Sequence, residues 1–241
     1  MFLRHARWLV AGIAAITGIG LSPARSNADV TILVEELNAS STVVASQSQT
    51  LSGSGSLNFT GVYFTGLATV STNSTSSSSV ASLIPGFTGQ LTNAFDVTQD
   101  HTLRVTVSDN NFQPTGPNGT LKVQVSGSTG FASGTESIVE DTRVYDPATN
   151  STILLVPNLL SPDGSLQQKI VGTQGLTSPY AIQQTLTISF SGSIPANATF
   201  GSTGGASLAS SPVPAPGGLA LALIGLPLIG LRRALRKRVA A

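Results

Sequence analysis

Alternating apolar and polar residues dominate the middle of this chain and limit what it can fold into. In 102–109 (TLRVTVSD), Leu103, Val105 and Val107 share one face of an extended strand, and the residues between them are polar or charged. The same period of two recurs in 29–37, 120–127 and 184–192, and more weakly in 41–46, 57–64, 66–71, 137–145 and 151–156. This period is typical of strands with one buried and one solvated face, so the sequence predicts an all-β protein.

Nine or ten such strands predict an antiparallel β-sandwich of jelly-roll or Greek-key type over residues 29–200. The turn-forming residues 110–119 predict a hairpin that joins strands 102–109 and 120–127. The low-complexity run 71–79 is expected to form a loop, and the Gly/Ser-rich run 201–212 a flexible linker.

The charges are distributed unevenly along the chain. Eight of the 12 basic residues lie in 1–28 or 213–241, whereas all 11 acidic residues lie between these segments, which gives the middle a net charge of −7. An acidic body repels phosphate backbones, so nucleic acid is not expected as a partner. The chain has no cysteine, which excludes disulfides, thiolate metal sites and a cysteine nucleophile.

Residues 1–28 have the three parts of a secretory signal peptide. Arg4 and Arg7 precede the apolar run 8–21, and the small residues Ser26 and Ala28 stand at the −3 and −1 positions. This pattern predicts an N-terminal signal helix that signal peptidase removes between Ala28 and Asp29. The alternative is an uncleaved anchor helix, which the short apolar run disfavours.

The C-terminal segment 213–241 is organised in a similar way. The apolar run 217–231 would form a helix of about 22 Å, shorter than a bilayer core of about 30 Å. It is expected to act as a C-terminal transmembrane helix with help from its flanks, and the basic residues after it favour the cytoplasmic side. These basic residues are Arg232, Arg233, Arg236, Lys237 and Arg238.

Val213, Pro214, Ala215 and Pro216, followed by this helix and the arginine cluster, resemble the PEP-CTERM sorting signal of exported bacterial proteins. Ala215 stands where the family usually has a glutamate. The resemblance covers about the last thirty residues. It implies export to the cell envelope, surface or exterior, membrane anchoring before processing by an exosortase-like enzyme, and association with exopolysaccharide.

The body contains a few residues of types that can carry catalysis or bind metal ions. His101 follows Asp100, but no nucleophile elbow is present, so we interpret it as a turn histidine. Neighbours on a strand point to opposite faces, so neither Glu35–Glu36 nor Glu140–Asp141 can flank one glycosidic bond, and both are expected to be solvated. Turn formation explains 109–111 and 162–164 better than calcium binding does. No catalytic residue, metal or cofactor is expected.

The leading hypothesis is therefore a non-enzymatic, exported surface or matrix protein. The first alternative is a carbohydrate-binding module, for which the mature chain offers no tryptophan and only Tyr63, Tyr145 and Tyr180. The second alternative is a secreted hydrolase, whose activity would depend on His101.

Overall fold

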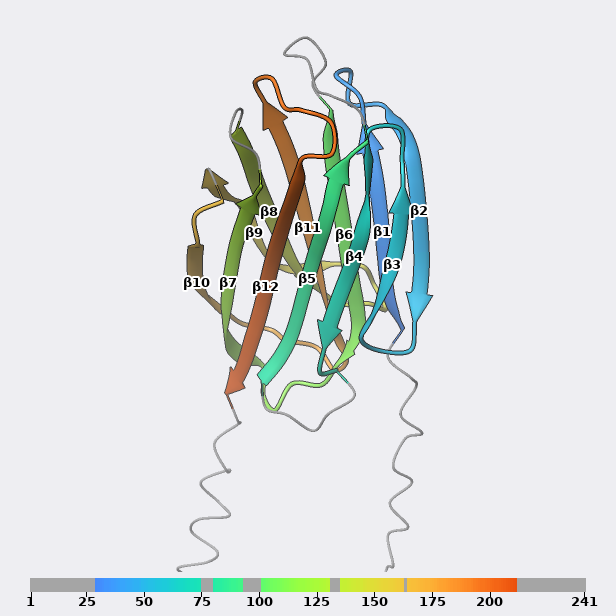
Figure 1. Cartoon of the computed structure of the whole chain (residues 1–241). Coiled ribbons are helices and arrows are strands. Elements are labelled where there is room, and N and C mark those ends of the chain that lie inside the picture. The colour runs from blue at the N-terminus through green and yellow to red at the C-terminus, as the bar shows by residue number, and fades with distance from the viewer. Residues whose placement is uncertain (1–28, 75–79, 93–100, 131–134, 163, 212–241) are drawn as a thin grey trace, which may run out of the picture.

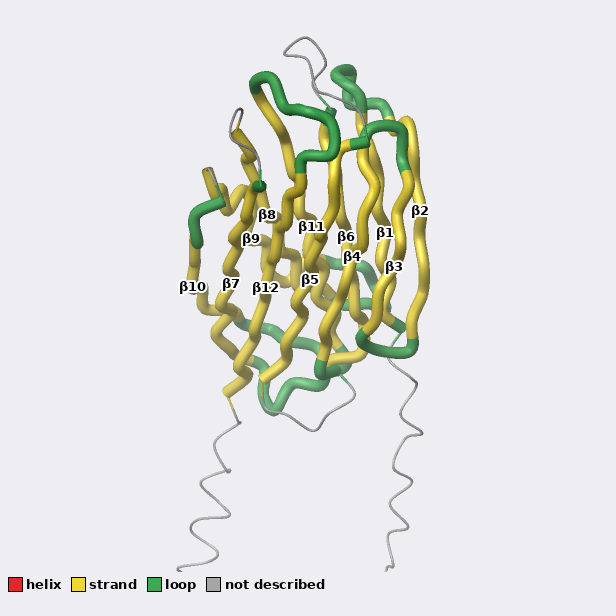
Figure 2. Tube along the Cα trace, in the orientation of Figure 1, coloured by secondary structure: helices red, strands yellow, loops and turns green. Residues whose placement is uncertain are grey.

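The computed structural model describes residues 29–74, 80–92, 101–130, 135–162 and 164–211, and within them the chain forms strands and loops but no helix (Figure 2). The expected all-β fold is confirmed, with every strand pair antiparallel. The strands are β1 Val30–Leu37, β2 Val43–Leu51, β3 Gly55–Thr60, β4 Phe64–Thr72, β5 Val80–Leu91, β6 Thr102–Phe112, β7 Asn118–Thr129, β8 Thr135–Tyr145, β9 Thr152–Pro162, β10 Gln167–Thr173, β11 Tyr180–Ser191 and β12 Thr199–Ser211.

These strands form two six-stranded sheets that pack face to face as a sandwich (Figure 1). The first sheet has the order β2-β1-β6-β11-β8-β9, and the second has the order β10-β7-β12-β5-β4-β3. Only β1–β2, β3–β4, β4–β5 and β8–β9 pair as consecutive strands. The other connections pass between the sheets, and such long-range neighbours are typical of Greek-key and jelly-roll sandwiches.

The period-two pattern correctly identifies the inner faces. Leu103, Val105 and Val107 of β6 are fully buried, and the strands with the strongest alternation, β1, β7 and β11, bury their apolar residues in the same way. A layer of phenylalanines links the two sheets: the Phe190 ring lies 5.6 Å from Phe64 and 4.8 Å from Phe200. Burying such side chains from both sheets stabilises the sandwich.

The expected hairpin between 102–109 and 120–127 is wrong. These segments form β6 and β7, which lie in opposite sheets. The connection 113–117 crosses from one layer to the other, and each strand finds its partners among distant segments. Alternation shows which face of a strand is buried, but a strand of either sheet can satisfy it.

The expected linker over 201–212 is also wrong for residues 201–211. They belong to β12, which lies between β7 and β5 in the middle of the second sheet. Its inner positions include Ser202, Gly204 and Ala206, which are small rather than strongly apolar, so the alternation is weak in the sequence. Two further strands, β5 and β10, were not expected, and 57–64 divides between β3 and β4 around the turn at 61–63.

Strand β1 begins and β12 ends at the same end of the sandwich (Figure 1). Asp29, the residue expected after signal cleavage, directly precedes β1 and is exposed. Ala28, the sorting motif Val213–Pro216 and the basic cluster 232–238 lie outside the described residues. Within the described part of the chain, no helix is long and apolar enough to span a bilayer.

Candidate functional site

The outer face of the second sheet, here called the hydroxyl face, carries mainly uncharged polar side chains. Thr60, Thr65, Thr88, Gln90 and Thr199 point outward from four adjacent strands, with Asn58 and Thr203 nearby. The six strands of this sheet contain no aspartate or glutamate, and their only charged residues are Lys122 and Lys169.

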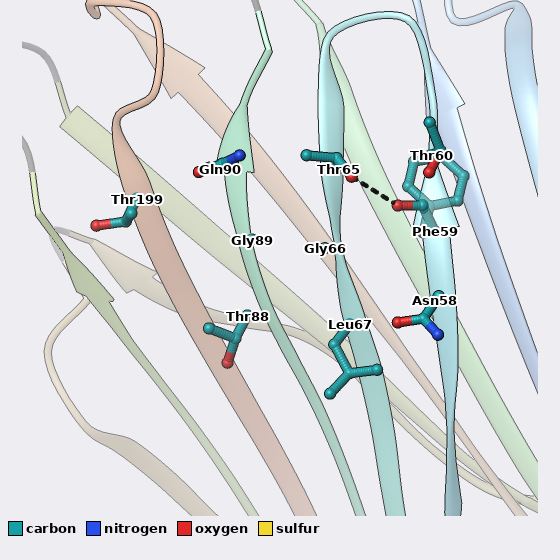
Figure 3. Close-up of a pocket in the computed structure, with 10 residues that line it drawn as sticks. All are labelled: Asn58, Phe59, Thr60, Thr65, Gly66, Leu67, Thr88, Gly89, Gln90 and Thr199. Carbon is teal, nitrogen blue, oxygen red and sulfur yellow. Dashed lines mark hydrogen bonds between the residues drawn. The ribbon is translucent and has the colours of Figure 1, made fainter.

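An open hollow of about 610 Å³ lies on this face (Figure 3). We call it the distal hollow because it lies at the end of the sheet where β12 begins, away from Ser211. From Thr199 to Ser211, β12 extends about 40 Å at about 3.3 Å per residue. The hollow is lined by Asn58, Phe59, Thr60, Thr65, Gly66, Leu67, Thr88, Gly89, Gln90 and Thr199.

A pair of glycines forms the floor of the distal hollow. Gly66 and Gly89 face each other across β4 and β5, and the Phe87 ring lies against their inner side. A Cβ atom added to Gly66 would lie 2.7 Å from Phe87 Cζ, and one added to Gly89 would lie 2.4 Å from Phe87 Cε1. Only glycine leaves room for this ring. The backbone of the two glycines therefore packs directly on Phe87 and forms the floor of the hollow.

The rim of the distal hollow offers unused hydrogen-bonding groups. The side chains of Asn58, Thr88, Gln90 and Thr199 make no hydrogen bond to other described residues, whereas Thr65 Oγ1 donates to the Phe59 carbonyl oxygen at 3.1 Å. Figure 3 shows Thr60, Thr65, Gln90 and Thr199 in one row, and Asn58, Leu67 and Thr88 in the next. Hydroxyl and amide groups around an exposed leucine can bind a ligand that is both hydroxylated and partly apolar.

The lining of the distal hollow contains no carboxylate, histidine or lysine. It therefore has no group that could serve as a general acid or base near neutral pH. Within the described residues, no three His, Asp or Glu side chains are grouped closely enough to hold a metal ion. The chemistry of the hollow is that of hydrogen bonding and apolar contact.

His101, the histidine expected in a turn, lies just before β6 and is buried. Its ring packs on Tyr63 with a centroid distance of 3.7 Å, and its Nδ1 atom lies 3.8 Å from Glu36 Oε1. Glu36 in turn accepts hydrogen bonds from the backbone N–H groups of Val62 at 2.8 Å and Tyr63 at 3.1 Å. This arrangement fixes the 61–63 turn between β3 and β4.

The expectation that both acidic pairs are solvated is wrong for one member of each pair. Glu35 and Asp141 lie on the outer face, but Glu36 and Glu140 are fully buried. Glu136 is buried on the same side of β8 as Glu140, and burial raises the pKa of each of these two carboxyl groups to about 8. Thr142 and Gln184 donate to Glu140 and offset part of its shift.

The tyrosines do not form a sugar-stacking platform. Tyr180 is buried and stacks on Phe112, Tyr63 packs on His101, and the Arg143 guanidinium lies 4.5 Å from the centre of the Tyr145 ring. Asp109 is also buried, and its Oδ2 accepts a hydrogen bond from Thr72 Oγ1 at 2.6 Å, so it serves the fold rather than a calcium loop.

Sequence reasoning did not identify the residues of the distal hollow. They come from β3, β4, β5 and β12, and the sequence predicts neither a strand at β5 nor one over most of β12, which has the composition of a linker. One local signal was available, because glycines inside a strand such as Gly66 often mark the close approach of another group. The buried glutamates could also have been found, since Glu36 continues the inward series Val30, Ile32 and Val34.

No protein-family model and no curated protein match this chain. Among solved structures, one from work on the promiscuous specificity of carbohydrate-binding modules of the β-sandwich superfamily is similar at a TM-score of 0.28 and 10% identity, covering 73% of this chain and 72% of that one. An isomalto-dextranase of Arthrobacter globiformis T6 complexed with panose is similar at a TM-score of 0.18 and 13% identity, over 73% of this chain and 33% of that one. Likenesses of this size do not establish a shared ligand.

Proposed function

We propose that this chain is a non-enzymatic, exported bacterial protein whose β-sandwich binds polysaccharide at the cell envelope or in the extracellular matrix. The observation that carries the proposal is the distal hollow, an open site on a sheet face with unused hydroxyl and amide groups and no charge. Sugar rings present hydroxyl groups along their edges, which can form hydrogen bonds with Thr88 and Gln90. They present C–H groups on their faces, which can pack against Leu67.

The hollow supports binding rather than hydrolysis. Glycoside hydrolysis needs two carboxyl groups on either side of the scissile bond, and none lines the hollow. The carboxyl groups of Glu136 and Glu140 lie between the sheets, where a polymer has no access. A hydrolase centred on His101 receives no support from the contacts described above, which link this residue to Glu36 and Tyr63.

Affinity electrophoresis of the full chain in gels containing neutral or acidic polysaccharides tests this proposal. The double variant Thr88→Ala with Gln90→Ala is expected to bind at least tenfold more weakly, because each lost hydrogen bond contributes about 1 kcal/mol. The matched control is Gln183→Ala with Thr187→Ala, which removes the same residue types from the outer face of the other sheet. Polysaccharide binding that neither double variant weakens would contradict the proposed site.

The sorting route is a separate part of the proposal. Cleavage after Ala28 and near Pro214–Pro216 would leave all twelve strands intact, because β1 starts at Val30 and β12 ends at Ser211. This supports a body that is exported, held in the membrane by its tail and then processed by an exosortase-like enzyme. The mass of the C-terminal peptide of native protein tests the route: an end near Pro214–Pro216 is expected, and an intact end at Ala241 would contradict processing.

A further inference from the structure

A second, smaller hollow lies on the hydroxyl face and differs from the distal hollow in its charge. Its volume is about 150 Å³, and it is lined by Ser82, Ile84, Lys122, Gln124, Gly205, Ala206 and Ser207. Lys122 and Ser82 flank Ser207 in the strand register, so the three side chains form a row across β7, β12 and β5. Adjacent strands lie about 4.8 Å apart, so this row spans about 10 Å. We call it the lysine hollow.

The ammonium group of Lys122 has no carboxylate partner among the described residues. Arg104 pairs with Glu35 in the first sheet, and the imidazole of His101 lies 3.8 Å from Glu36 beside the same sheet. Lys122 is exposed, and the rest of the hollow is lined by uncharged residues: Gln124 of the same strand, Gly205, Ala206 and Ser207 of β12, and Ser82 and Ile84 of β5. An unpaired ammonium beside hydroxyl and amide groups is suited to an anion that also accepts hydrogen bonds.

The fold separates this lysine from the negative charge of the body. Every acidic residue of the twelve strands belongs to the first sheet, whose mean plane lies about 10 Å from that of the second. Exposed charges further apart than about 8 Å are largely screened at physiological salt. The buried carboxyl group of Glu140 reaches the β12 backbone, where a Cβ atom on Gly204 would lie 3.3 Å from its Oε2 atom, but its pKa of about 8 keeps it largely neutral near pH 7. The hydroxyl face is therefore locally cationic although the segment between the two chain ends is acidic overall.

The two hollows lie along the same pair of strands. From Gln90 to Ser82 on β5, and from Thr199 to Ser207 on β12, the separation is eight residues, or about 26 Å along an extended strand. We infer that the ligand of the hydroxyl face is an acidic polysaccharide, whose sugar hydroxyl groups bind in the distal hollow while a carboxylate further along the polymer binds Lys122. This inference rests on the proposed function and names the class of polysaccharide.

Polygalacturonate and its methyl ester provide a matched pair of probes, since esterification removes the charge and keeps the sugar backbone. Binding of the full chain to each polymer, and to dextran as a neutral reference, is measured by affinity electrophoresis at low and high salt. We expect the acid form to bind about three- to fivefold more tightly than the ester at low salt, the range for one exposed ion pair. The preference should disappear in Lys122→Gln and persist in Lys169→Gln, which changes a lysine of the same sheet outside both hollows.

The outcomes separate this inference from the proposed function. Equal binding of acid and ester, or a preference that Lys122→Gln leaves intact, overturns the acidic ligand while binding through Thr88 and Gln90 still stands. A preference lost equally in both lysine variants also overturns it, since the effect would then reflect net charge alone. If neither form of the polymer nor dextran is retarded, both the inference and the proposed function fail.

Discussion

Replacing Glu140 with glutamine is expected to remove a large part of the pH dependence of stability. Glu140 lies between the sheets on β8, where its Oε1 atom accepts hydrogen bonds from Thr142 Oγ1 at 3.0 Å and from Gln184 Nε2. Its Oε2 atom is buried without a hydrogen-bond partner. Burial raises the pKa of this carboxyl group from 4.5 to about 8, so the folded protein holds its proton near neutral pH.

The sign and size of the effect follow from proton linkage. The folded state binds this proton more tightly than the unfolded chain, so the stabilisation is complete below pH 4.5 and is lost as the pH rises towards 8. The difference between 8 and 4.5, at about 1.4 kcal/mol per pH unit, amounts to about 5 kcal/mol at most. Between acidic pH and pH 7, the contribution of Glu140 to the free energy of unfolding falls by about 3 kcal/mol.

Glutamine keeps the shape of the protonated acid and cannot ionise. Its carbonyl oxygen can accept from Thr142 and Gln184, and its NH₂ group replaces the oxygen that has no partner. We expect Glu140→Gln to match the wild-type protein within about 1 kcal/mol near pH 5 and to exceed its free energy of unfolding by about 3 kcal/mol near pH 7. Glu136 also has a pKa of about 8, so some pH dependence should remain.

Urea unfolding followed by far-ultraviolet circular dichroism at several pH values measures this difference. Glu35→Gln is the control, since Glu35 lies on the outer face in an ion pair with Arg104 and its replacement leaves both Glu136 and Glu140 in place. That variant should retain the wild-type slope of stability against pH. A constant gap between Glu140→Gln and the wild-type protein from acidic to alkaline pH would refute the reasoning, because it would show that Glu140 does not take up a proton on folding.

Three further predictions concern the fold around the distal hollow. Gly66→Ala places a Cβ atom 2.5 Å from the Thr88 carbonyl oxygen and should cost about 2–4 kcal/mol in urea unfolding, whereas Gly172→Ala, with open space around it, should change stability by less than about 1 kcal/mol. Glu36→Ala removes the acceptor of two backbone N–H groups, so it should lower the free energy of unfolding by about 2–3 kcal/mol and speed amide exchange at the 61–63 turn. Glu36→Gln should destabilise the fold less. Unchanged amide exchange at the turn would argue against this role of Glu36. A chain that ends at residue 198 should not fold, as judged by circular dichroism, whereas one that ends at residue 211 should, because β12 pairs with both β7 and β5; a folded shorter chain would show that β12 is dispensable.

Much of the inner surface could be predicted because it depends on local geometry. Successive side chains of a strand point to opposite faces, so Leu121, Val123 and Val125 had to share a face wherever their strand was placed. The same rule shows that Glu35 and Glu36 point apart, as they do. The same rule places Glu36 and Glu140 on the inner face, whereas the general preference of carboxylates for water predicts that they are solvated.

The distal hollow could not be predicted in the same way. Its residues come from segments as distant as Asn58 and Thr199, and only the register of β3, β4, β5 and β12 brings them together. Strand β12 shows why. Between the buried Phe200 and Leu208, its inner positions are filled by serine, glycine and alanine, so its hydrophobic pattern is weak and its place in the sheet depends on the strands beside it.

The sequence alone determined which residues of the strongly alternating strands face the core, because side-chain direction in a strand is set by covalent geometry. It also determined the negative charge of the middle segment and the absence of disulfides. Only the tertiary structure decided which sheet each strand joins, that the acidic residues of the strands gather in one sheet, and that two glycines open a hollow above Phe87. These features depend on backbone hydrogen bonds between distant segments, and such bonds join any residue types whose strands meet in register.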